Sequence, residues 1–367
     1  MPPPLAAAGS DRCSLTVSSA AAAEAGVVAG STGAVVCLTV GTYAGLDLSG
    51  THSGSVTVEP VPGQTVTLTA GVRDSHGDEV AVYAEPGASD VIIHGFLVRG
   101  EVELAPGASA IRIDHNDITG GPFGVVLDSV NCRAPNAPTW QGCGTEPRIT
   151  DVIISGNRIH NIGGPHGDDA INVNNYANLR VSGNDFYGMV EGGNHTDCLQ
   201  STFGGSGLVF DHNYEHDNNC QGLFTKDGDV TDAVVYDNLF VRDQVSRQPE
   251  ANLDIFNVYR LILRNNTSLP DTGDVLRVQS SAQPPRATVD HNVFDTFADG
   301  CCAEPATFTL TEDANVFLNR PLSFRAARSD QIGRPAFVDP TADDYRLADN
   351  PEGIGIDWRP ADQHYGP

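Results

Sequence analysis

The sequence has almost no lysine, little methionine or tryptophan, and no long hydrophobic run. Its 367 residues include two Met and two Trp, and Lys226 is the single lysine beside 20 arginines. No apolar stretch is long enough to span a bilayer. The scarcity of Lys and Met, together with 39 Gly and 23 Pro, indicates many turns and few long helices. We therefore expect mostly β structure.

Positive charge is also scarce. The chain carries 47 acidic and 21 basic side chains, for a net charge of −26. DNA, RNA and anionic membrane surfaces need a basic footprint, so these partners are excluded. A polyanionic substrate would require a binding groove less acidic than the chain as a whole, or bound cations.

The eight cysteines lack any CxxC spacing, which disfavours a zinc site and favours disulfides in an oxidising compartment. We therefore expect secretion. The start Met1-Pro2-Pro3-Pro4 has neither a basic region nor a hydrophobic one, so we expect that a signal peptide has been removed. Cys301 and Cys302 are adjacent and stay unassigned. Spacing suggests three pairs: Cys13 with Cys37, Cys132 with Cys143, and Cys198 with Cys220.

A repeat runs through the middle of the chain. Alternating β-forming residues are followed by a short polar turn with Asn, at steps mostly of 25 to 29 residues. A period near 27 with short strands and no helical pattern predicts a solenoid of stacked coils, with the Asn side chains forming a ladder. The seven segments are IRIDHNDI (111–118), VIISGNRI (152–159), LRVSGNDF (179–186), LVFDHNYE (208–215), VVYDNLF (234–240), LILRNNTS (261–268) and ATVDHNVF (287–294), and their turn residues are Asn116, Asn157, Asn184, Asn213, Asn238, Asn266 and Asn292.

This repeat resembles the right-handed parallel β-helix proteins of the pectin-lyase-like superfamily. The resemblance implies an all-β fold with one structural domain. Residues 1–90 would form an N-terminal cap and the first coils, 91–300 the repeats, and 301–367 the last coil and a tail that covers the far end. A capped solenoid is expected to be a monomer.

A second strand in each coil carries polar residues at matching positions. We expect Ile171, Leu199, Leu223, Ile255 and Leu276 to form an inward column. Since side chains alternate along a strand, Asn172, Gln200, Asp254 and Arg277 would then face outward, with Lys226 just beyond on the same side. Such a polar stripe suits an extended sugar chain.

The stripe can supply the groups that a polysaccharide lyase needs. Unlike Arg, a Lys can lose its proton, so Lys226 would be the base that removes the proton next to a uronic acid carboxylate. Arg277, Gln200 and Asn172 would bind that carboxylate, and His195, oriented by Asp197, would deliver a proton. Alginate- and dermatan-cleaving lyases of this superfamily pair a Lys with an Arg on neighbouring coils, and the arrangement of Lys226 and Arg277 resembles theirs. Asp254, Phe224 and Gln279 would contact substrate.

A bound Ca²⁺ is the one cofactor that the sequence suggests. Asp168 with Asp169, Asp197 or Asp254 could hold the ion, which would ease the repulsion between an acidic protein and an acidic polymer.

Besides a uronate epimerase, two other functions stay open. A glycoside hydrolase needs two carboxyl groups, which the aspartates could supply. Polygalacturonase-type hydrolases of this superfamily carry Gly-His-Gly and Arg-Ile-Lys motifs, and the chain lacks both. A sugar-binding β-helix without turnover would need only aromatic residues along the stripe, such as Phe224, Phe256 and Tyr259.

Overall fold

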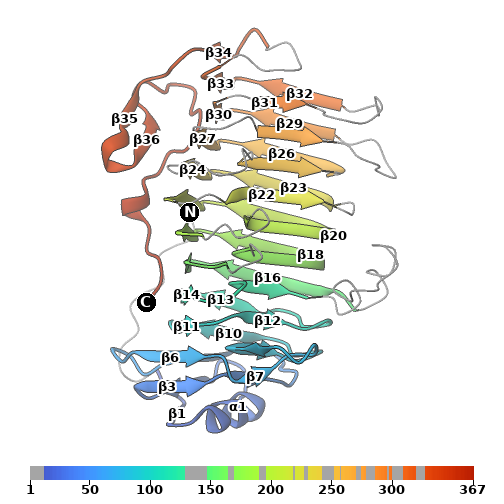
Figure 1. Cartoon of the computed structure of the whole chain (residues 1–367), viewed down its shortest axis with the longest axis vertical. Coiled ribbons are helices and arrows are strands. Elements are labelled where there is room, and N and C mark those ends of the chain that lie inside the picture. Colours follow the sequence, from blue (N-terminus) through green and yellow to red (C-terminus); the bar gives the residue numbers. More distant parts are fainter. Residues whose placement is uncertain are drawn as a thin grey trace.

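The computed structural model is a solenoid of about eight turns, spaced by about 26 residues, with parallel strands stacked along one axis (Figure 1). The predicted all-β parallel β-helix is confirmed. The structure describes residues 12–128, 147–163, 169–189, 196–217, 220–226, 230–241, 252–256, 258–269, 274–277, 286–295, 297–299, 309–319 and 327–367, and for 274–277 and 297–299 the backbone alone.

Each coil contributes a strand to a large sheet, then a short strand to a small sheet, then a second strand to the large sheet. We call the two sets of strands in the large sheet the first column and the second column. The first column consists of β1 (Leu15–Val17), β2 (Val35–Leu38), β5 (Val56–Pro60), β10 (Val91–His94), β13 (Arg112–Asp114), β16 (Ile149–Ser155), the later halves of β18 (Ile171–Ser182) and β20 (Asp197–Asp211), β23 (Val230–Tyr236), β26 (Arg260–Arg264), β29 (Arg286–Asp290) and β32 (Thr309–Asp313).

The second column carries the residues that the sequence predicts to form the functional stripe. It consists of β4 (Leu46–Leu48), β9 (Val82–Ala84), β12 (Val102–Leu104), β15 (Val125–Leu127), the earlier halves of β18 and β20, β22 (Gln221–Lys226), β25 (Leu253–Phe256), β28 (Asp274–Arg277) and β31 (Phe297–Asp299).

The small sheet lies beside these columns, and all of its strands are short. It consists of β3 (Gly41–Ala44), β6 (Val66–Thr69), β11 (Leu97–Arg99), β14 (Asp117–Thr119), β17 (Arg158–His160), β19 (Asp185–Tyr187), β21 (Tyr214–His216), β24 (Leu239–Val241), β27 (Thr267–Leu269), β30 (Val293–Phe294), β33 (Val316–Phe317) and β34 (Gln331–Ile332).

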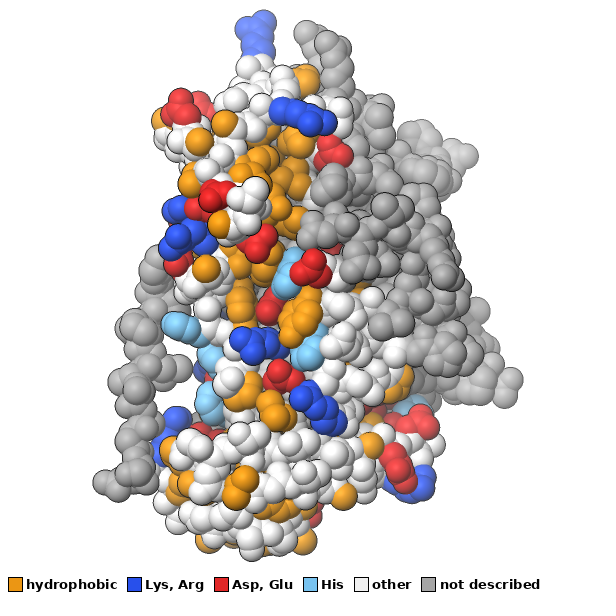
Figure 2. All heavy atoms as spheres, turned by 60° about the vertical axis from the view of Figure 1, so that its left-hand side comes forward, with side chains coloured by type: hydrophobic (Ala, Val, Ile, Leu, Met, Phe, Trp, Pro, Cys, Tyr) orange, Lys and Arg blue, Asp and Glu red, His pale blue; other side chains and the backbone are white. Residues whose placement is uncertain are grey.

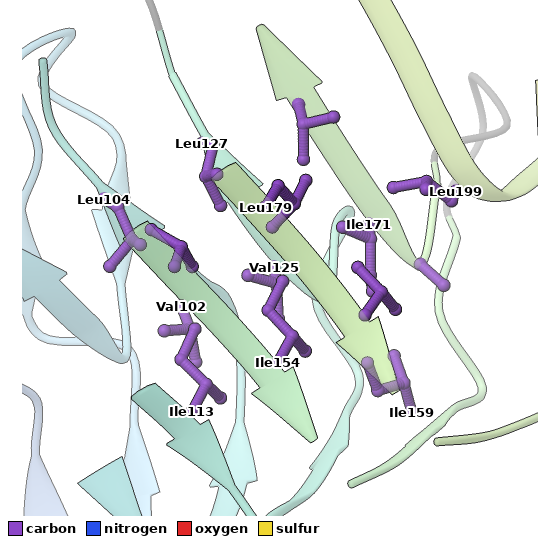
Figure 3. Close-up of a cluster of buried hydrophobic side chains, with 14 of the residues drawn as sticks. Val102, Leu104, Ile113, Val125, Leu127, Ile154, Ile159, Ile171, Leu179 and Leu199 are labelled. Atoms are coloured by element: carbon purple, nitrogen blue, oxygen red, sulfur yellow. The ribbon is translucent and has the colours of Figure 1, made fainter. Parts of the chain in front are cut away.

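A dry core runs along the solenoid axis because every strand sends alternate apolar side chains inward. Figure 3 shows one section, where Val102, Ile113 and Val125 from successive strands pack together. The predicted inward residues Ile171, Leu199 and Leu223 are at most 1% exposed. The predicted alignment of Leu223 with Ile255 is wrong by two residues. Leu223 pairs with Leu253, whereas Ile255 pairs with Thr225 on one side and with Leu276 on the other. A shift of two residues keeps the same face inward, so the alternation alone could not detect it.

The predicted Asn ladder is confirmed, and it is one rung longer than expected. In each coil the turn Asn is at most 1% exposed, and its backbone N–H and Nδ2 donate to Oδ1 of the Asn in the next coil, as Asn157 does to Asn184 at 3.0 Å. Asn315 forms an additional rung by accepting from Asn292. Asp330 then ends the ladder, since its Oδ1 accepts the N–H of Asn315 at 2.8 Å.

Buried aspartates flank the ladder. Burial by itself would raise the pKa of Asp114, but hydrogen bonds with His115, His94 and Ser155 outweigh it and hold the pKa well below its usual range. Such a carboxylate stabilises the fold above the pKa of the unfolded chain, 3.8, and this stabilisation is lost as the pH falls below that value. We expect Asp114→Asn to flatten the loss of thermal stability between about pH 4 and pH 2. A variant as acid-sensitive as the parent protein would contradict this.

The two ends of the chain cover the solenoid in different ways. The helix α1 (Ala20–Ala29), which begins at the N-cap Ser19, packs against β1, β2, β4 and β5. The hairpin β7 (Val72–Arg73) with β8 (Glu79–Val80) is antiparallel, as is β35 (Phe337–Asp339) with β36 (Asp344–Leu347). Single turns of 3-10 helix occur at Pro340–Ala342 and Pro360–Asp362.

The C-terminal tail does not only cover the far end, as the sequence suggested. It returns along the outer face of the small sheet (Figure 1), and Gly366 N–H donates to the Gly156 carbonyl. Its apolar residues cover apolar positions of that sheet, and hydrophobic side chains run lengthwise along the upper half of this face in Figure 2. Ile354 and Ile356 are at most 2% exposed, and Trp358 Nε1 donates to the Asp237 carbonyl at 2.8 Å. The tail follows the side because the small sheet would otherwise expose Leu239, Leu269 and Val293.

Two of the three proposed disulfides are present. Cys13 is bonded to Cys37, and Cys198 to Cys220, with 5.7 Å between the Cα atoms of each pair. Cys132, Cys143, Cys301 and Cys302 lie outside the described residues. Among the residues that are described, no helix is both long and apolar enough to cross a membrane.

Candidate active site

The candidate site occupies the outer face of the second column, on β18, β20, β22 and β25. The first of its two rows joins Asn172, Gln200, Phe224 and Asp254, which pair in succession across the four strands. Two residues farther along, the second row joins Asn174, Thr202 and Lys226. Leu199 and Leu223 alternate with these residues and point into the core, which fixes the orientation of both rows.

A hydrogen-bonded network of carboxylates and amides connects β18 with β20. Asn172 Nδ2 donates to Asp169 Oδ2 at 2.8 Å and to Gln200 Oε1 at 2.9 Å. Gln200 Nε2 donates to Asp197 Oδ2 at 2.8 Å, and the Asp197 N–H donates to Asp169 Oδ1 at 3.0 Å. Asp169 and Asp197 are 4% and 0% exposed. The network therefore fixes the amide groups, and Asn172 uses its amide nitrogen within the protein.

Lys226 lies at the end of β22, partly buried, in the second row. No hydrogen bond or ion pair joins its ammonium group to any residue that the structure describes. In contrast, nine arginines of the same described part form ion pairs with Asp or Glu: Arg12, Arg73, Arg99, Arg112, Arg180, Arg260, Arg264, Arg346 and Arg359. Arg158, Arg286, Arg328 and Arg334 of the described part form no ion pair either, so the lack of a partner does not by itself set Lys226 apart. Its distinction is its place in the second row, on the strands that carry the buried carboxylates.

Two phenylalanines form an apolar patch beside these polar groups. The rings of Phe224 and Phe256 meet edge to face, with 5.9 Å between centroids. Phe224 is 6% exposed and its neighbour in the first row, Asp254, is 7% exposed. The same strands thus combine a lysine, buried carboxylates and aromatic rings, which are the groups that bind and process sugars.

The structure does not describe the side chains of four predicted site residues. His195, Asp168 and Gln279 lie outside the described residues. For Arg277 the backbone alone is described, and it pairs with Phe256. Because Thr225 pairs with Ile255, Phe256 lies next to Lys226 in the adjacent coil. Phe256 of β25, the strand that also carries Asp254, therefore separates Lys226 from Arg277 in register, with about 10 Å between the backbones of the two basic residues.

Of the residues suggested for Ca²⁺, Asp169 and Asp197 already accept hydrogen bonds, and Asp168 lies outside the described residues. Both oxygens of Asp169 accept hydrogen bonds, and no group of three metal-ligating side chains among the described residues includes Asp169, Asp197 or Asp254. This arrangement does not fit the many oxygen ligands that Ca²⁺ takes, so we derive no step of a reaction through calcium.

The sequence reasoning did not single out Asn174 and Thr202, although they complete the row of Lys226. Their side chains are in contact, with 2.5 Å between Thr202 Oγ1 and the Asn174 amide group. The signal was present in the sequence, because Asn172 and Asn174 are two residues apart, as are Gln200 and Thr202, so each pair shares one face of its strand.

A cavity of about 480 Å³ lies elsewhere, between the N-terminal coils and the C-terminal residues, and His94 and His115 line it. His94 Nδ1 forms a hydrogen bond with Asp114 Oδ2 at 3.0 Å, and His115 Nδ1 lies 3.1 Å from the same oxygen. The Asp-His-Asn turn recurs at Asp211 and Asp290 with the same close contact between histidine and aspartate. This recurrence identifies the histidine of the turn as part of the coil architecture.

Solved structures with a similar fold support the parallel β-helix described above. The described strands of the two columns and the small sheet stack in parallel from β1 to β33. A crystal structure of an alginate lyase from Paenibacillus sp. str. FPU-7 superimposes with a TM-score of 0.55 at 15% identity, over 87% of this chain and 99% of that one. The fold is therefore a parallel β-helix, consistent with the resemblance to pectin-lyase-like proteins. At this level of identity the likeness concerns the fold alone.

Other solved β-helix structures superimpose less closely. They include DFA-IIIase from Arthrobacter chlorophenolicus A6 without its lid, at 14% identity over 82% of this chain and 75% of that one, with a TM-score of 0.44. Pectate lyase Pel9A matches at 11% identity over 89% and 84%, with a TM-score of 0.43. No protein-family model and no curated protein matches this sequence.

Proposed function

We propose that this β-helix is a polysaccharide lyase that cleaves a uronic acid polymer by β-elimination. The placement of Lys226, the single lysine, in the second row of the candidate site is the observation that carries the proposal, and no described residue forms an ion pair or hydrogen bond with it. The alginate lyase with the same fold adds support for this class of substrate.

In this mechanism the neutral amine of Lys226 takes the proton next to the uronate carboxylate. The electron pair forms a carbon-carbon double bond, and the glycosidic bond to the neighbouring carbon breaks. The departing oxygen takes a proton, a role proposed for His195. Negative charge that develops on the carboxylate needs donors nearby, and we assign this to Arg277 and to the second amide N–H of Gln200, which no described residue accepts.

The buried carboxylates favour glycoside hydrolysis as a second candidate. Asp169 precedes β18, Asp197 lies on β20 and Asp254 lies on β25, and all three are less than 8% exposed. A hydrolase would use two of them, one as acid and one as base or nucleophile. Replacement of Asp197 and Asp254 by Asn would then remove turnover.

A screen of alginates, pectates, glucuronans and glycosaminoglycans separates the candidates, with and without Ca²⁺ and a chelator. A lyase yields unsaturated products that absorb in the ultraviolet, and we expect this absorbance to rise with at least one polymer. Reducing ends without absorbance would replace the lyase by the hydrolase. Binding without any shortening of the polymer would contradict both and indicate a sugar-binding β-helix.

A further inference from the structure

A buried group of acidic side chains lies outside the candidate active site, beneath the hairpin β7–β8. Glu103 of β12 is 0% exposed, and Asp74, directly after β7, is 8% exposed. Their carboxyl groups face each other. Both Glu103 oxygens and Asp74 Oδ2 are buried and accept no hydrogen bond from a described residue. Two facing carboxylates cannot satisfy each other, since each only accepts, so this arrangement requires a shared proton or a cation.

A histidine and a third carboxylate complete the group. His76 in the hairpin turn forms a hydrogen bond through Nε2 to Asp128 Oδ2, and Asp128 is 1% exposed. One ligand atom each from His76, Glu103 and Asp128 lies within 4.8 Å of the others. No arginine of the described part forms an ion pair with Glu103 or Asp74. The His76 side chain is 21% exposed, which leaves a path from solvent to the group.

We propose that Glu103, Asp128, His76 and Asp74 bind a divalent transition-metal ion, Zn²⁺ or Mn²⁺, that fastens the hairpin β7–β8 to the solenoid. Three carboxylates and one imidazole make four donors, the number that Zn²⁺ takes. The imidazole distinguishes the site from a calcium site, whose ligands are oxygens. Donors bonded to zinc at about 2.0–2.2 Å lie roughly 3 to 4 Å apart, which small side-chain rotations would provide.

Without the ion, the group would hold a proton. Burial first, and then the hydrogen bond and nearby charge of Asp74, with Glu101 and Asp128 also close, raise the pKa of Glu103 to about 9. A proton shared by Asp74 and Glu103 is thus the alternative occupant. If this shared proton is the occupant, the group should bind no metal ion.

The site is distinct from the candidate active site but shares its column. Glu103 pairs with Val126, which pairs with Asn172 of the first row. Two steps of about 4.8 Å separate the Glu103 and Asn172 backbones by roughly 10 Å. A metal-bound hairpin would therefore form a fixed wall at the N-terminal end of the two rows.

Isothermal titration of the full chain, first stripped with a chelator and dialysed, tests the site directly. We expect one equivalent of Zn²⁺ or Mn²⁺ to bind, and Ca²⁺ to bind at least tenfold more weakly. Glu103→Gln and His76→Ala should each weaken binding by tenfold or more. The matched control is His291→Ala, which removes a histidine bonded to an aspartate elsewhere on the solenoid and should leave affinity unchanged.

Hydrogen exchange provides a second readout that does not depend on activity. Added Zn²⁺ or Mn²⁺ should slow exchange of amides in residues 72–80, and should not do so in Glu103→Gln. Absence of saturable binding to the parent protein, or equal binding by Glu103→Gln and His76→Ala, would overturn the proposal. So would protection confined to other parts of the chain. Since none of these measurements uses a polysaccharide, they stand apart from the test of lyase activity.

Discussion

Lys226→Ala should lower kcat on the preferred polymer by about a hundredfold to ten thousandfold, the contribution typical of a general base. Lys226→Arg should be equally inactive, because a guanidinium keeps the positive charge but does not lose its proton. The absorbance of the unsaturated product measures both. This pair of variants separates a base from a residue that only attracts a negatively charged substrate.

The control for this experiment is Arg286→Ala. Arg286 lies at the start of β29 in the first column, is exposed, and is outside both rows of the candidate site. Its removal changes the net charge by the same amount and should leave kcat and KM unchanged. Substantial activity in Lys226→Arg would show that the charge matters and not the loss of a proton, and would assign the base to another residue.

Asn213→Ala should be strongly destabilising, although Asn213 lies outside both rows of the candidate active site. Asn213 Oδ1 accepts the backbone N–H and Nδ2 of Asn184, and its Nδ2 donates to the Val181 carbonyl and to Asn238. The change leaves these buried groups without a partner, at about 1 to 3 kcal/mol each. We expect the free energy of unfolding to fall by at least about 3 kcal/mol, measured by urea denaturation.

Asn319→Ala is the matched control for the ladder. This Asn is exposed and donates to Asp295 Oδ1 at 2.7 Å, so its loss should change stability by no more than about 0.5 kcal/mol. If Asn213→Ala were as mild as the control, the ladder would not hold the coils together, and apolar packing alone would account for the stacking.

The fold could be predicted from the sequence because its repeat is local. Strand alternation and the Asn turn recur within each coil, so each copy reinforces the others. Asn315 was missed because its segment was assigned to the tail, although it has the same pattern. The helix α1 was missed because its Ala-rich sequence carries no clear apolar stripe, and Ser19 is its clearest signal.

The site was harder to predict because its contacts join different coils. Alternation places Asn172, Gln200 and Lys226 on one face, but it does not distinguish Leu253 from Ile255 as the neighbour of Leu223. Likewise, nothing local brings His76 to Asp128, which lies 52 residues away in the chain. Such pairs follow from where the hairpin folds over the solenoid, and the repeat does not encode that position.

The ladder ends at Asp330, and this residue affects how readily a second molecule could stack on that end of the solenoid. Each Asn from Asn116 to Asn292 donates an amide N–H to the Asn of the coil that follows, whereas Asp330 ends the ladder with a second carboxylate oxygen, which accepts the N–H of Ala327. A neighbouring chain that docked against this end would meet an acceptor in place of a donor, and a negative charge as well. We therefore expect this end of the solenoid to resist stacking onto a second copy of the chain.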